Sequence, residues 1–328
     1  MRVLVTGATG FLGGNLLRML CDDGHYVRYL SRQGRVARTA LDYPQAECCE
    51  GNLNDPLSLE RACKDIDWIF HAAAIVSSLE RDRSQMEQVN VEGTKSLFYA
   101  ARKAGVKRFV HISSVDTIGI EEKCAIANED VLCDFSNLRN PYPDTKLAAE
   151  KFLLQNKNTD IQTVVVNPGF MIGAYDTHGT SSRIVYEILN NSGLFAPSGG
   201  NSFVDVKDVC RGAILAAEKG RSGERYILAG HNLTYREFFE KVAVLCHRPK
   251  PLAVLPAFIT LSAASAIEKI SLIIGEKPIV TKNDAVFSLL PHYYSSQKAE
   301  KELGYVIHPI EPAIEDAITW FSSEKKSK

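Results

Sequence analysis

Apolar residues follow two different spacings along this chain, and together these spacings predict a layered α/β fold. The run Val3–Val5 is short, continuous and rich in β-branched residues, which is typical of a strand buried on both faces of a parallel sheet. Leu12, Leu16 and Leu20 then recur at the spacing of a helix with one buried side. The same alternation predicts further strands at 25–31, 46–51, 67–71, 108–112 and 226–228, and helices at 57–63, 88–104 and 142–155. We therefore expect a doubly wound parallel sheet with helices on both faces.

The second half of the chain is less regular and predicts two parts that are interleaved in sequence. We expect a sheet domain over residues 1–170, with a return segment at about 203–229. Residues 171–202 and 230–322 should form a smaller, mostly helical lobe that binds the substrate. The polar residues 323–328 predict a frayed tail.

The most apolar stretch is 251–275, and its place in the fold has two interpretations. Pro256 and the pair Glu268–Lys269 interrupt it, so no charge-free run of about 18 residues is left to span a membrane. We expect a core helix of the C-terminal lobe here. The alternative is an apolar substrate wall or a contact with a membrane surface.

Composition excludes several classes of function. A formal net charge of −1 over 328 residues argues against a general nucleic-acid binder, which would carry a basic surplus. The eight cysteines contain no C-x-x-C pair and the eight histidines have no ligand spacing, so we expect no metal site. Scattered cysteines and a strand directly at the N-terminus, with no signal peptide before it, predict a cytoplasmic protein with reduced thiols and no integral membrane segment.

A glycine-rich loop follows the first predicted strand. Gly7, Gly10 and Gly13 have the spacing G-x-x-G-x-x-G, and the first helix begins within this run. Glycines let the backbone approach a pyrophosphate closely, and a helix N-terminus offers unpaired N–H groups and a partial positive charge. The arrangement predicts a Rossmann-type dinucleotide site whose loop contacts come from Gly7, Thr9, Gly10, Phe11, Leu12 and Gly13.

The end of the second strand indicates which dinucleotide binds. An NAD site normally has an acid there for the ribose 2′-hydroxyl, but this chain has Ser31 and Arg32 and no acid before Asp42. An arginine suits a 2′-phosphate, so we expect NADP, with NAD possible and a solvated loop as the alternative explanation. Further cofactor contacts are expected along the strand ends, at Asn52 and Leu53 for adenine, at Ala72, Ala73 and Ala74, and at Asn90 near the nicotinamide.

Two side chains four residues apart are the strongest candidates for proton transfer. Tyr142 and Lys146 share one face of a predicted helix, where the ammonium would favour the phenolate. A surface pair is the alternative for this common spacing. Ser113 and Ser114 follow a strand, at the edge where parallel sheets hold ligands. His71 also ends a strand, but beside three alanines it is expected to pack and hydrogen-bond rather than to catalyse.

Taken together, these motifs resemble those of the extended short-chain dehydrogenases/reductases, the NAD-dependent epimerase/dehydratase family. The resemblance covers nearly the whole chain and implies that Ser114 polarises the substrate oxygen, Tyr142 exchanges its proton and Lys146 assists Tyr142 and bonds the nicotinamide ribose. It also implies a carboxamide contact at Pro168, Gly169 and Phe170 and a homodimer through the helices after Gln88 and Tyr142. The matching motifs are TGATGFLG at 6–13, HAAA at 71–74, VNVEGT at 89–94, ISS at 112–114, YPDTK at 142–146, NPGFMIG at 167–173 and FVDVKDV at 203–209.

Two residues depart from the family pattern, and one segment indicates which of the family's reactions to expect. Asn52 replaces the usual Asp, and Asn167 stands where many relatives have Arg. The segment 164–170, VVVNPGF, looks more like the dihydroflavonol-reductase and 3-beta-hydroxysteroid-dehydrogenase branch than like sugar-nucleotide epimerases. We therefore expect NADP(H)-dependent interconversion of a ketone and a secondary alcohol on a fairly apolar small molecule. The alternatives are a nucleotide-sugar 4-epimerase or dehydratase with tightly bound NAD, and a non-catalytic NADP-sensing or assembly protein.

Overall fold

A seven-stranded parallel sheet forms the centre of the computed structural model, which describes residues 1–121, 125–131, 140–157, 159–190, 193–275, 278 and 280–326. The strand order β10-β6-β5-β4-β1-β2-β3 reverses between β1 and β4, which places a topological switch point there. The predicted doubly wound sheet is therefore confirmed. Its strands are β1 (Arg2–Thr6), β2 (Tyr26–Ser31), β3 (Ala46–Glu50), β4 (Trp68–His71), β5 (Arg108–Ile112), β6 (Gln162–Pro168) and β10 (Arg225–Leu228).

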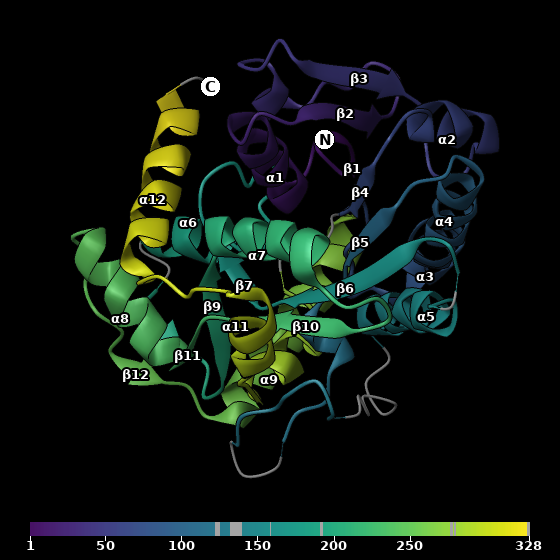
Figure 1. Cartoon of the computed structure of the whole chain (residues 1–328). Coiled ribbons are helices and arrows are strands. Elements are labelled where there is room, and N and C mark those ends of the chain that lie inside the picture. The colour runs from purple at the N-terminus through teal and green to yellow at the C-terminus, as the bar shows by residue number, and fades with distance from the viewer. Residues whose placement is uncertain are drawn as a thin grey trace.

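Helices cover both faces of this sheet because neighbouring strand residues point to opposite sides (Figure 1). Val3 and Val5 belong to one buried cluster, with residues of α1 (Phe11–Asp22), α7 (Val206–Lys219) and α11 (Gln297–Leu303). Leu4 belongs to the other cluster, with residues of α2 (Pro56–Cys63), α4 (Gly93–Lys103) and α5 (Pro141–Gln155). The alternation of burial along β1 thus separates two hydrophobic layers.

A second, smaller sheet carries the rest of the chain. Its order is β11-β9-β13, with β7 paired to β9, and Phe203 of β9 stacks on Phe238 with ring centroids 3.9 Å apart. Both the chain leaving β6 and the chain leaving β9 pass directly between the two parts. The elements are β7 (Phe170–Ile172), α6 (Arg183–Leu189), β8 (Phe195–Ala196), β9 (Gly200–Asp205), β11 (His231–Thr234), α8 (Tyr235–Leu245), β12 (Ala253–Val254), β13 (Pro291–His292) and α12 (Glu311–Lys326).

Two expectations about helices need correction. The helix expected over 88–104 is not uniform: the π-helical segment η3 (Glu87–Glu92) precedes α4 and follows the short elements η2 (Glu80–Asp82) and α3 (Arg83–Met86). Such single-turn π segments frequently occur at functional sites. The tail expected at 323–328 is also wrong as far as it is described, because α12 continues to Lys326.

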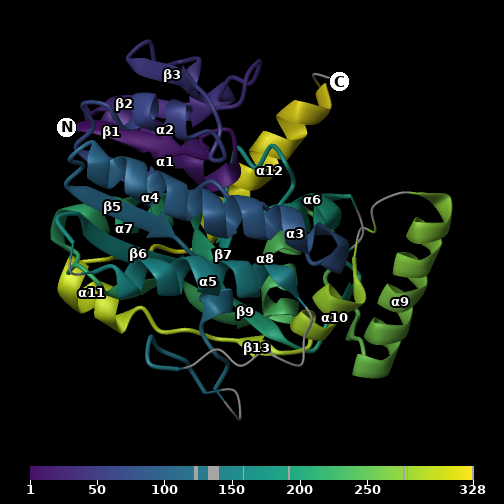
Figure 2. The same cartoon turned by 90° about the vertical axis from the view of Figure 1, so that its right-hand side faces the viewer.

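The expected core helix within 251–275 is a surface helix. α9 (Ala257–Ile274) packs against α10 (Lys282–Ser288) and stands at the edge of the molecule (Figure 2). Phe258 is 70% exposed and Ile273 is 84% exposed, whereas Ala264 and Ser271 face the protein. The composition of the stretch suggested burial, but its large apolar side chains lie on the outer side of the helix.

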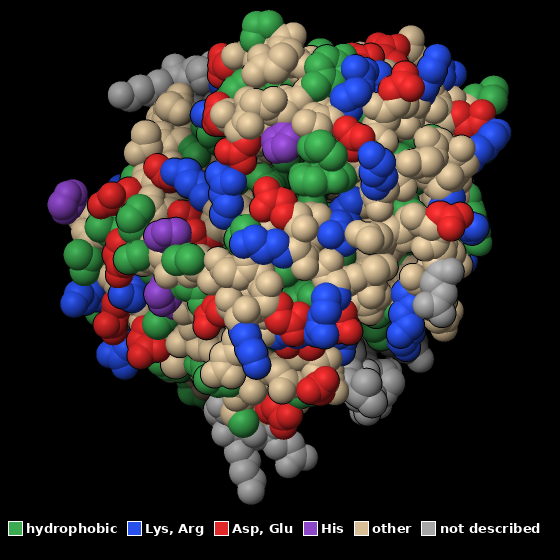
Figure 3. Space-filling model, in the orientation of Figure 1, with side chains coloured by type: hydrophobic (Ala, Val, Ile, Leu, Met, Phe, Trp, Pro, Cys, Tyr) green, Lys and Arg blue, Asp and Glu red, His purple; other side chains and the backbone are tan. Residues whose placement is uncertain are grey.

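Charged side chains of both signs are interspersed over the face in Figure 3. Within the described ranges, no helix is long and apolar enough to cross a membrane, and no cluster of three or more potential metal ligands is found. Six cysteines in these ranges are free, while Cys124 and Cys133 lie outside the described residues.

Candidate active site

The glycine loop between β1 and α1 is closed too tightly for side chains. Gly7 has a φ of +77°, and a Cβ on it would lie 2.6 Å from the backbone nitrogen of Ala73. A Cβ on Gly13 would lie 2.3 Å from the carbonyl oxygen of Gly7. Gly10 is the N-cap of α1 and provides no side-chain cap, so the first N–H groups of the helix remain available to an anion. The loop therefore fits a pyrophosphate.

The remaining predicted loop residues differ in how they could contact a dinucleotide. Thr9 is partly exposed between the glycines. Phe11 and Leu12 are buried in the cluster beneath α1. Their side chains pack in the core, so a contact with the pyrophosphate would come from their backbone.

The end of β2 presents a buried hydroxyl and a group of exposed arginines. Ser31 donates a hydrogen bond to the carbonyl oxygen of Arg35 at 2.7 Å, which holds the turn that begins at Arg32. Arg32 and Arg35 are exposed, and the guanidinium of Arg38 in η1 (Arg38–Ala40) lies 5.0 Å from the ring centroid of Trp320. The structure thus places a positively charged turn at this strand end.

The segment after β3 places Asn52 and Leu53 differently. Asn52 is exposed, and its side-chain oxygen accepts the N–H of Asn54 at 2.8 Å. Leu53 is buried and packs so closely on Gly93 that a Cβ on that glycine would lie 2.8 Å from Leu53 Cβ. Asn52 is therefore accessible to an adenine, whereas the Leu53 side chain belongs to the core.

His71 joins three elements below the alanine segment. Its ring nitrogens are bonded to Thr6 Oγ1 at 2.7 Å and to Thr94 Oγ1 at 2.8 Å. Burial, followed by the charge of Lys146, lowers the pKa of His71 to about 3. A neutral imidazole held on both sides is a structural link between β1, β4 and α4. The segment 72–74 continues from it, and Ala72 N–H donates to the carbonyl oxygen of Thr6 at 3.2 Å.

Asn90 lies in the π-helical segment and links the alanine segment to α5. Its side-chain oxygen accepts the N–H of Ile75 at 2.8 Å, and its amide donates to the Ile75 carbonyl at 3.0 Å. The same amide donates to Thr145 Oγ1 at 3.1 Å. Asn90 therefore fixes the distance between the strand end at Ala74 and the helix that carries Tyr142 and Lys146.

α5 brings the two candidate proton-transfer residues to the carboxyl end of β5. Asn140 caps the helix by accepting the N–H of Tyr142 at 3.1 Å, and Pro141 occupies its first turn. One turn further, Lys146 is buried and donates to the carbonyl oxygen of Ile112 at 2.5 Å. Burial lowers the pKa of Lys146 to about 8, although the Glu150 carboxylate opposes this shift.

Ser114 and Tyr142 come together at this end of the sheet. Burial raises the pKa of Tyr142 above its usual range, Asp116 raises it further, and the hydrogen bond with Ser114 acts in the opposite direction. The Ser114 hydroxyl donates to Asp116 Oδ2 at 3.0 Å and accepts the Asp116 N–H at 3.1 Å. The structure therefore gathers Ser114, Tyr142 and Lys146, with the Asp116 carboxyl as an additional neighbour.

Asp116 was not among the residues that the sequence indicated. Burial raises its pKa, while His292 and the hydrogen bond from Ser114 lower it. His292 is buried and stacks on Phe287 with ring centroids 5.3 Å apart. Because His292 comes from β13, far along the chain, only the fold reveals that these groups lie beside Ser114.

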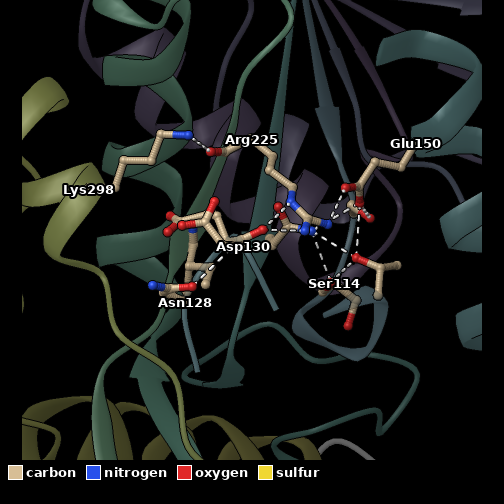
Figure 4. A network of polar contacts seen from close by, with 11 residues as sticks. Ser114, Asn128, Asp130, Glu150, Arg225 and Lys298 are labelled. Atoms are coloured by element: carbon tan, nitrogen blue, oxygen red, sulfur yellow. Dashed lines mark hydrogen bonds and ion pairs between the residues drawn. The ribbon is translucent and has the colours of Figure 1, made fainter. Parts of the chain in front are cut away.

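A buried carboxylate on α5 organises the backbone beneath the site (Figure 4). Glu150 Oε2 accepts hydrogen bonds from Ser113 at 2.8 Å, from Thr117 at 2.9 Å and from Asn167 at 3.1 Å. Its other oxygen pairs with Arg225 at 3.1 Å. The hydroxyl of Ser113 is thereby committed to this network. The spacing of Tyr142, Lys146 and Glu150, four residues each, is the signal that could have indicated it.

The end of β6 and the residues that follow it are held by hydrogen bonds and close packing. Asn167 donates to the carbonyl oxygen of Ser114 at 3.1 Å, so it anchors the serine strand end. Pro168 is buried, and Gly169 lies so close to β9 that a Cβ would be 2.6 Å from the Ser202 carbonyl. Phe170 packs edge-on against Phe203 at 5.4 Å. A carboxamide contact of these three residues stays a prediction.

Comparison with known proteins gives matches over the whole chain. A model of the NAD dependent epimerase/dehydratase family matches residues 3–229. A putative dihydroflavonol 4-reductase of Synechocystis sp. is 31% identical over 97% of this chain and 94% of that protein. Sterol demethylase protein B of Methylococcus capsulatus is 31% identical and covers 98% of each chain.

Solved structures agree with this fold. The crystal structure of gox2253 superimposes with a TM-score of 0.85 at 32% identity and covers 98% of both chains. A UDP-glucose 4-epimerase of Thermotoga maritima superimposes with a TM-score of 0.79 over 99% of this chain, but at 19% identity it supports the fold alone. The chain therefore belongs to the NAD-dependent epimerase/dehydratase family of extended short-chain dehydrogenases/reductases, as the motifs predicted, and is an oxidoreductase that uses a nicotinamide cofactor and a small-molecule substrate.

Proposed function

We propose that this enzyme interconverts a ketone and a secondary alcohol on a fairly apolar small molecule, with NADP(H) as the cofactor. The observation that carries the proposal is the placement of three side chains at the carboxyl end of β5: Ser114 directly after this strand, and Tyr142 and Lys146 one helical turn apart on α5, with the Lys146 ammonium bonded to the Ile112 carbonyl. A set of this kind has a purpose in proton transfer and none in simple nucleotide binding. Relatives that match nearly the whole chain include proteins named dihydroflavonol 4-reductase and 3-beta-hydroxysteroid dehydrogenase.

When bound, the cofactor would supply the hydride for the carbonyl carbon, while side chains of the protein would donate a hydrogen bond and a proton to the carbonyl oxygen. Tyr142 is protonated at neutral pH because burial raises its pKa, so its hydroxyl can donate the proton in ketone reduction. The Ser114 hydroxyl donates a hydrogen bond to the same oxygen. The Lys146 ammonium stabilises the phenolate that remains.

Asp116 acts through Ser114 as a positioning residue. In the structure, the Ser114 hydroxyl donates to the Asp116 carboxylate and therefore points away from a substrate oxygen. When Asp116 is protonated, which burial favours, its own O–H can donate to Ser114 Oγ instead. The serine hydrogen is then free for the substrate.

The turn after β2 supports NADP over NAD. Arg32 and Arg35 are exposed beside the buried Ser31, and residues 31–41 contain no carboxylate that would repel a 2′-phosphate. Cofactor binding is therefore the first experiment: cofactor-stripped protein is titrated with NADPH and with NADH.

We expect tighter binding of NADPH and a loss of about tenfold or more in Arg32→Ala, since one charge-assisted hydrogen bond to phosphate is removed. Arg102→Ala, on the exposed side of α4, is the matched control and should retain the preference. NADPH consumption with a panel of apolar ketones then tests the reaction. A preference for NADH, or NADPH binding that is equal in both variants, contradicts the NADP assignment.

A nucleotide-sugar 4-epimerase or dehydratase is the second candidate. The observation that favours this function is Asp116, because an acid beside Tyr142 offers a further group for proton transfer. This function predicts NAD that copurifies with the protein and no net consumption of added NADPH. A homodimer through α4 and α5 stays a prediction from the family resemblance, and light scattering of the purified protein tests it.

A further inference from the structure

α9 directs most of its large apolar side chains away from the protein. At about 100° per residue, the exposed ones fall on one half of the helix circumference. On the opposite half, which faces the protein, Ala264 and Ser271 are buried and Leu261 and Ser265 are partly buried. We call the exposed half the α9 outer face, and its large members are Phe258, Ile259, Ile267, Ile270, Ile273 and Ile274.

The exposed apolar surface continues beyond the helix. Leu252 is 71% exposed and Val254 is also exposed, just before α9 begins. Val254 lies in β12, which pairs with β8, where the side chain of Phe195 is exposed as well. Clustering of large exposed apolar side chains on one helix face, as on α9, is typical of a binding surface rather than of ordinary solvent exposure.

Among the described residues near α9 in the sequence, four basic side chains are exposed, and two carboxylates accept backbone N–H groups. Arg248, Lys250, Lys269 and Lys282 are all exposed. Glu268 accepts the backbone N–H of Lys282 at 2.8 Å, and Asp284 accepts the Thr281 N–H at 2.9 Å in the cap of α10. Lys269 lies at the edge of the α9 outer face, from where its ammonium can reach a headgroup while its stem stays on apolar surface.

α9 is also connected to the border of the candidate active site. It packs on α10, and Thr281 at the start of α10 bonds Ser78 at 3.1 Å, in the segment that follows the cofactor-facing alanines. At the other end of α10, Phe287 stacks on His292, the neighbour of Asp116. α10 therefore lies between α9 and residues that border the candidate active site.

We propose that the α9 outer face docks this protein onto an anionic lipid surface, with the helix lying in the plane of the interface. α9 stands at the edge of the molecule (Figure 2). Its exposed apolar face with a lysine at the edge has the form of an interfacial helix. The exposed basic residues around it complement anionic headgroups. A second copy of the chain fits this face less well as a partner. Protein–protein interfaces usually contain several hydrogen bonds, and on the α9 outer face only Ser262 and Lys269 have polar side chains that could form them. Docking would also let the enzyme take an apolar ketone directly from the lipid. That second step rests on the proposed function, whereas docking itself does not.

The test is co-flotation of the full chain with vesicles of phosphatidylcholine containing about one third phosphatidylglycerol, and with vesicles of phosphatidylcholine alone. We expect binding to the anionic vesicles that weakens with added salt. Ile270→Ser combined with Ile273→Ser should lower the partition coefficient by about tenfold or more, since two inserted side chains are lost. The double variant Leu57→Ser and Val306→Ser, at exposed positions on other elements, is the matched control and should bind like the unmodified protein.

Circular dichroism establishes that both double variants fold, and vesicle binding needs neither cofactor nor substrate. A failure of docking is therefore distinct from a failure of the proposed reaction, which is measured with a water-soluble ketone and no vesicles. The proposal is overturned if the unmodified protein does not float with anionic vesicles, or if both double variants float equally well. It is also overturned if light scattering finds self-association that only the α9 variant abolishes and no vesicle binding.

Discussion

At the scale of single residues, the hydroxyl of Tyr142 can be removed with little change in packing. Tyr142→Phe keeps the ring on α5 but removes the proton donor, so turnover should fall by about 10²–10⁴-fold. NADPH affinity should change little, because the glycine loop and the β2 turn are untouched. Steady-state kinetics and a binding titration measure the two effects separately. Tyr99→Phe removes an exposed hydroxyl from α4 and should leave turnover and NADPH affinity unchanged. Near-normal turnover of Tyr142→Phe would contradict the proposed mechanism.

Asp116 can be tested through the pH dependence of alcohol oxidation, which requires the Tyr142 phenolate. Because the Asp116 carboxylate raises the pKa of Tyr142, Asp116→Asn should lower that pKa. The rising limb of kcat/KM for oxidation should therefore move to lower pH. Asp144→Asn changes a carboxylate on the same helix that pairs with Arg83 at 3.0 Å, and it should leave the limb in place.

A purely structural role of Asp116 would lower the rate without moving the limb. Ser114, His292 and Tyr235 also interact with this carboxyl, and all three are retained in the variant. A limb that stays in place, or moves to higher pH, contradicts the effect of the Asp116 carboxylate on the pKa of Tyr142.

Some residues of this site could be predicted from the sequence and others could not. Tyr142 and Lys146 could be predicted because an i, i+4 pair on a helix carries its geometry in its spacing. The choice of Ser114 over Ser113 rested on a family pattern, and the structure adds a physical distinction, since the Ser113 hydroxyl is held by Glu150. His292 could not be found because its contact with Asp116 depends on how two distant segments meet.

At the scale of elements, α5 is fixed to the sheet by Glu150. Glu150→Ala would leave Arg225 without its buried partner and would remove the acceptor of three hydrogen bonds. We expect a loss of about 3–5 kcal/mol in the free energy of unfolding, measured by urea denaturation. Glu240→Ala breaks an exposed pair with Arg236 and should cost less than about 1 kcal/mol. Equal losses in the two variants would show that Glu150 does not hold the elements together.

Elements with a regular pattern were predicted well, and those shaped by packing were not. The strands of the main sheet are buried, so their apolar runs identify them. The composition of the π-helical segment does not distinguish it from an α-helix, and the contacts of its Asn90 with Ile75 and Thr145 depend on the fold. α9 was assigned to the core because its composition is apolar on both sides, while only the fold determines which side meets the protein.

At the scale of the whole molecule, the two parts should unfold together because the chain crosses between them repeatedly. β6 leads into β7, β9 leads into α7, and β10 leads into β11. Side chains also join them: the Lys207 ammonium pairs with Asp316 of α12 at 2.5 Å, and the Arg38 guanidinium lies 5.0 Å from the ring centroid of Trp320. Neither part can lose its structure without breaking contacts of the other.

The two tryptophans of the chain make this cooperativity measurable, since Trp68 lies in β4 of the main sheet and Trp320 lies in α12. Trp68→Phe and Trp320→Phe each leave one fluorescent reporter. Although each substitution can shift the midpoint of its own variant, the fluorescence transition in each should coincide with loss of helix measured by circular dichroism. NADPH at about 100 times its dissociation constant should stabilise both variants by about 2.7 kcal/mol, because a ligand of the main sheet stabilises everything that unfolds with it. A Trp320 signal that is lost before the helical signal, and that does not respond to NADPH, would mean that the smaller lobe unfolds independently of the cofactor site.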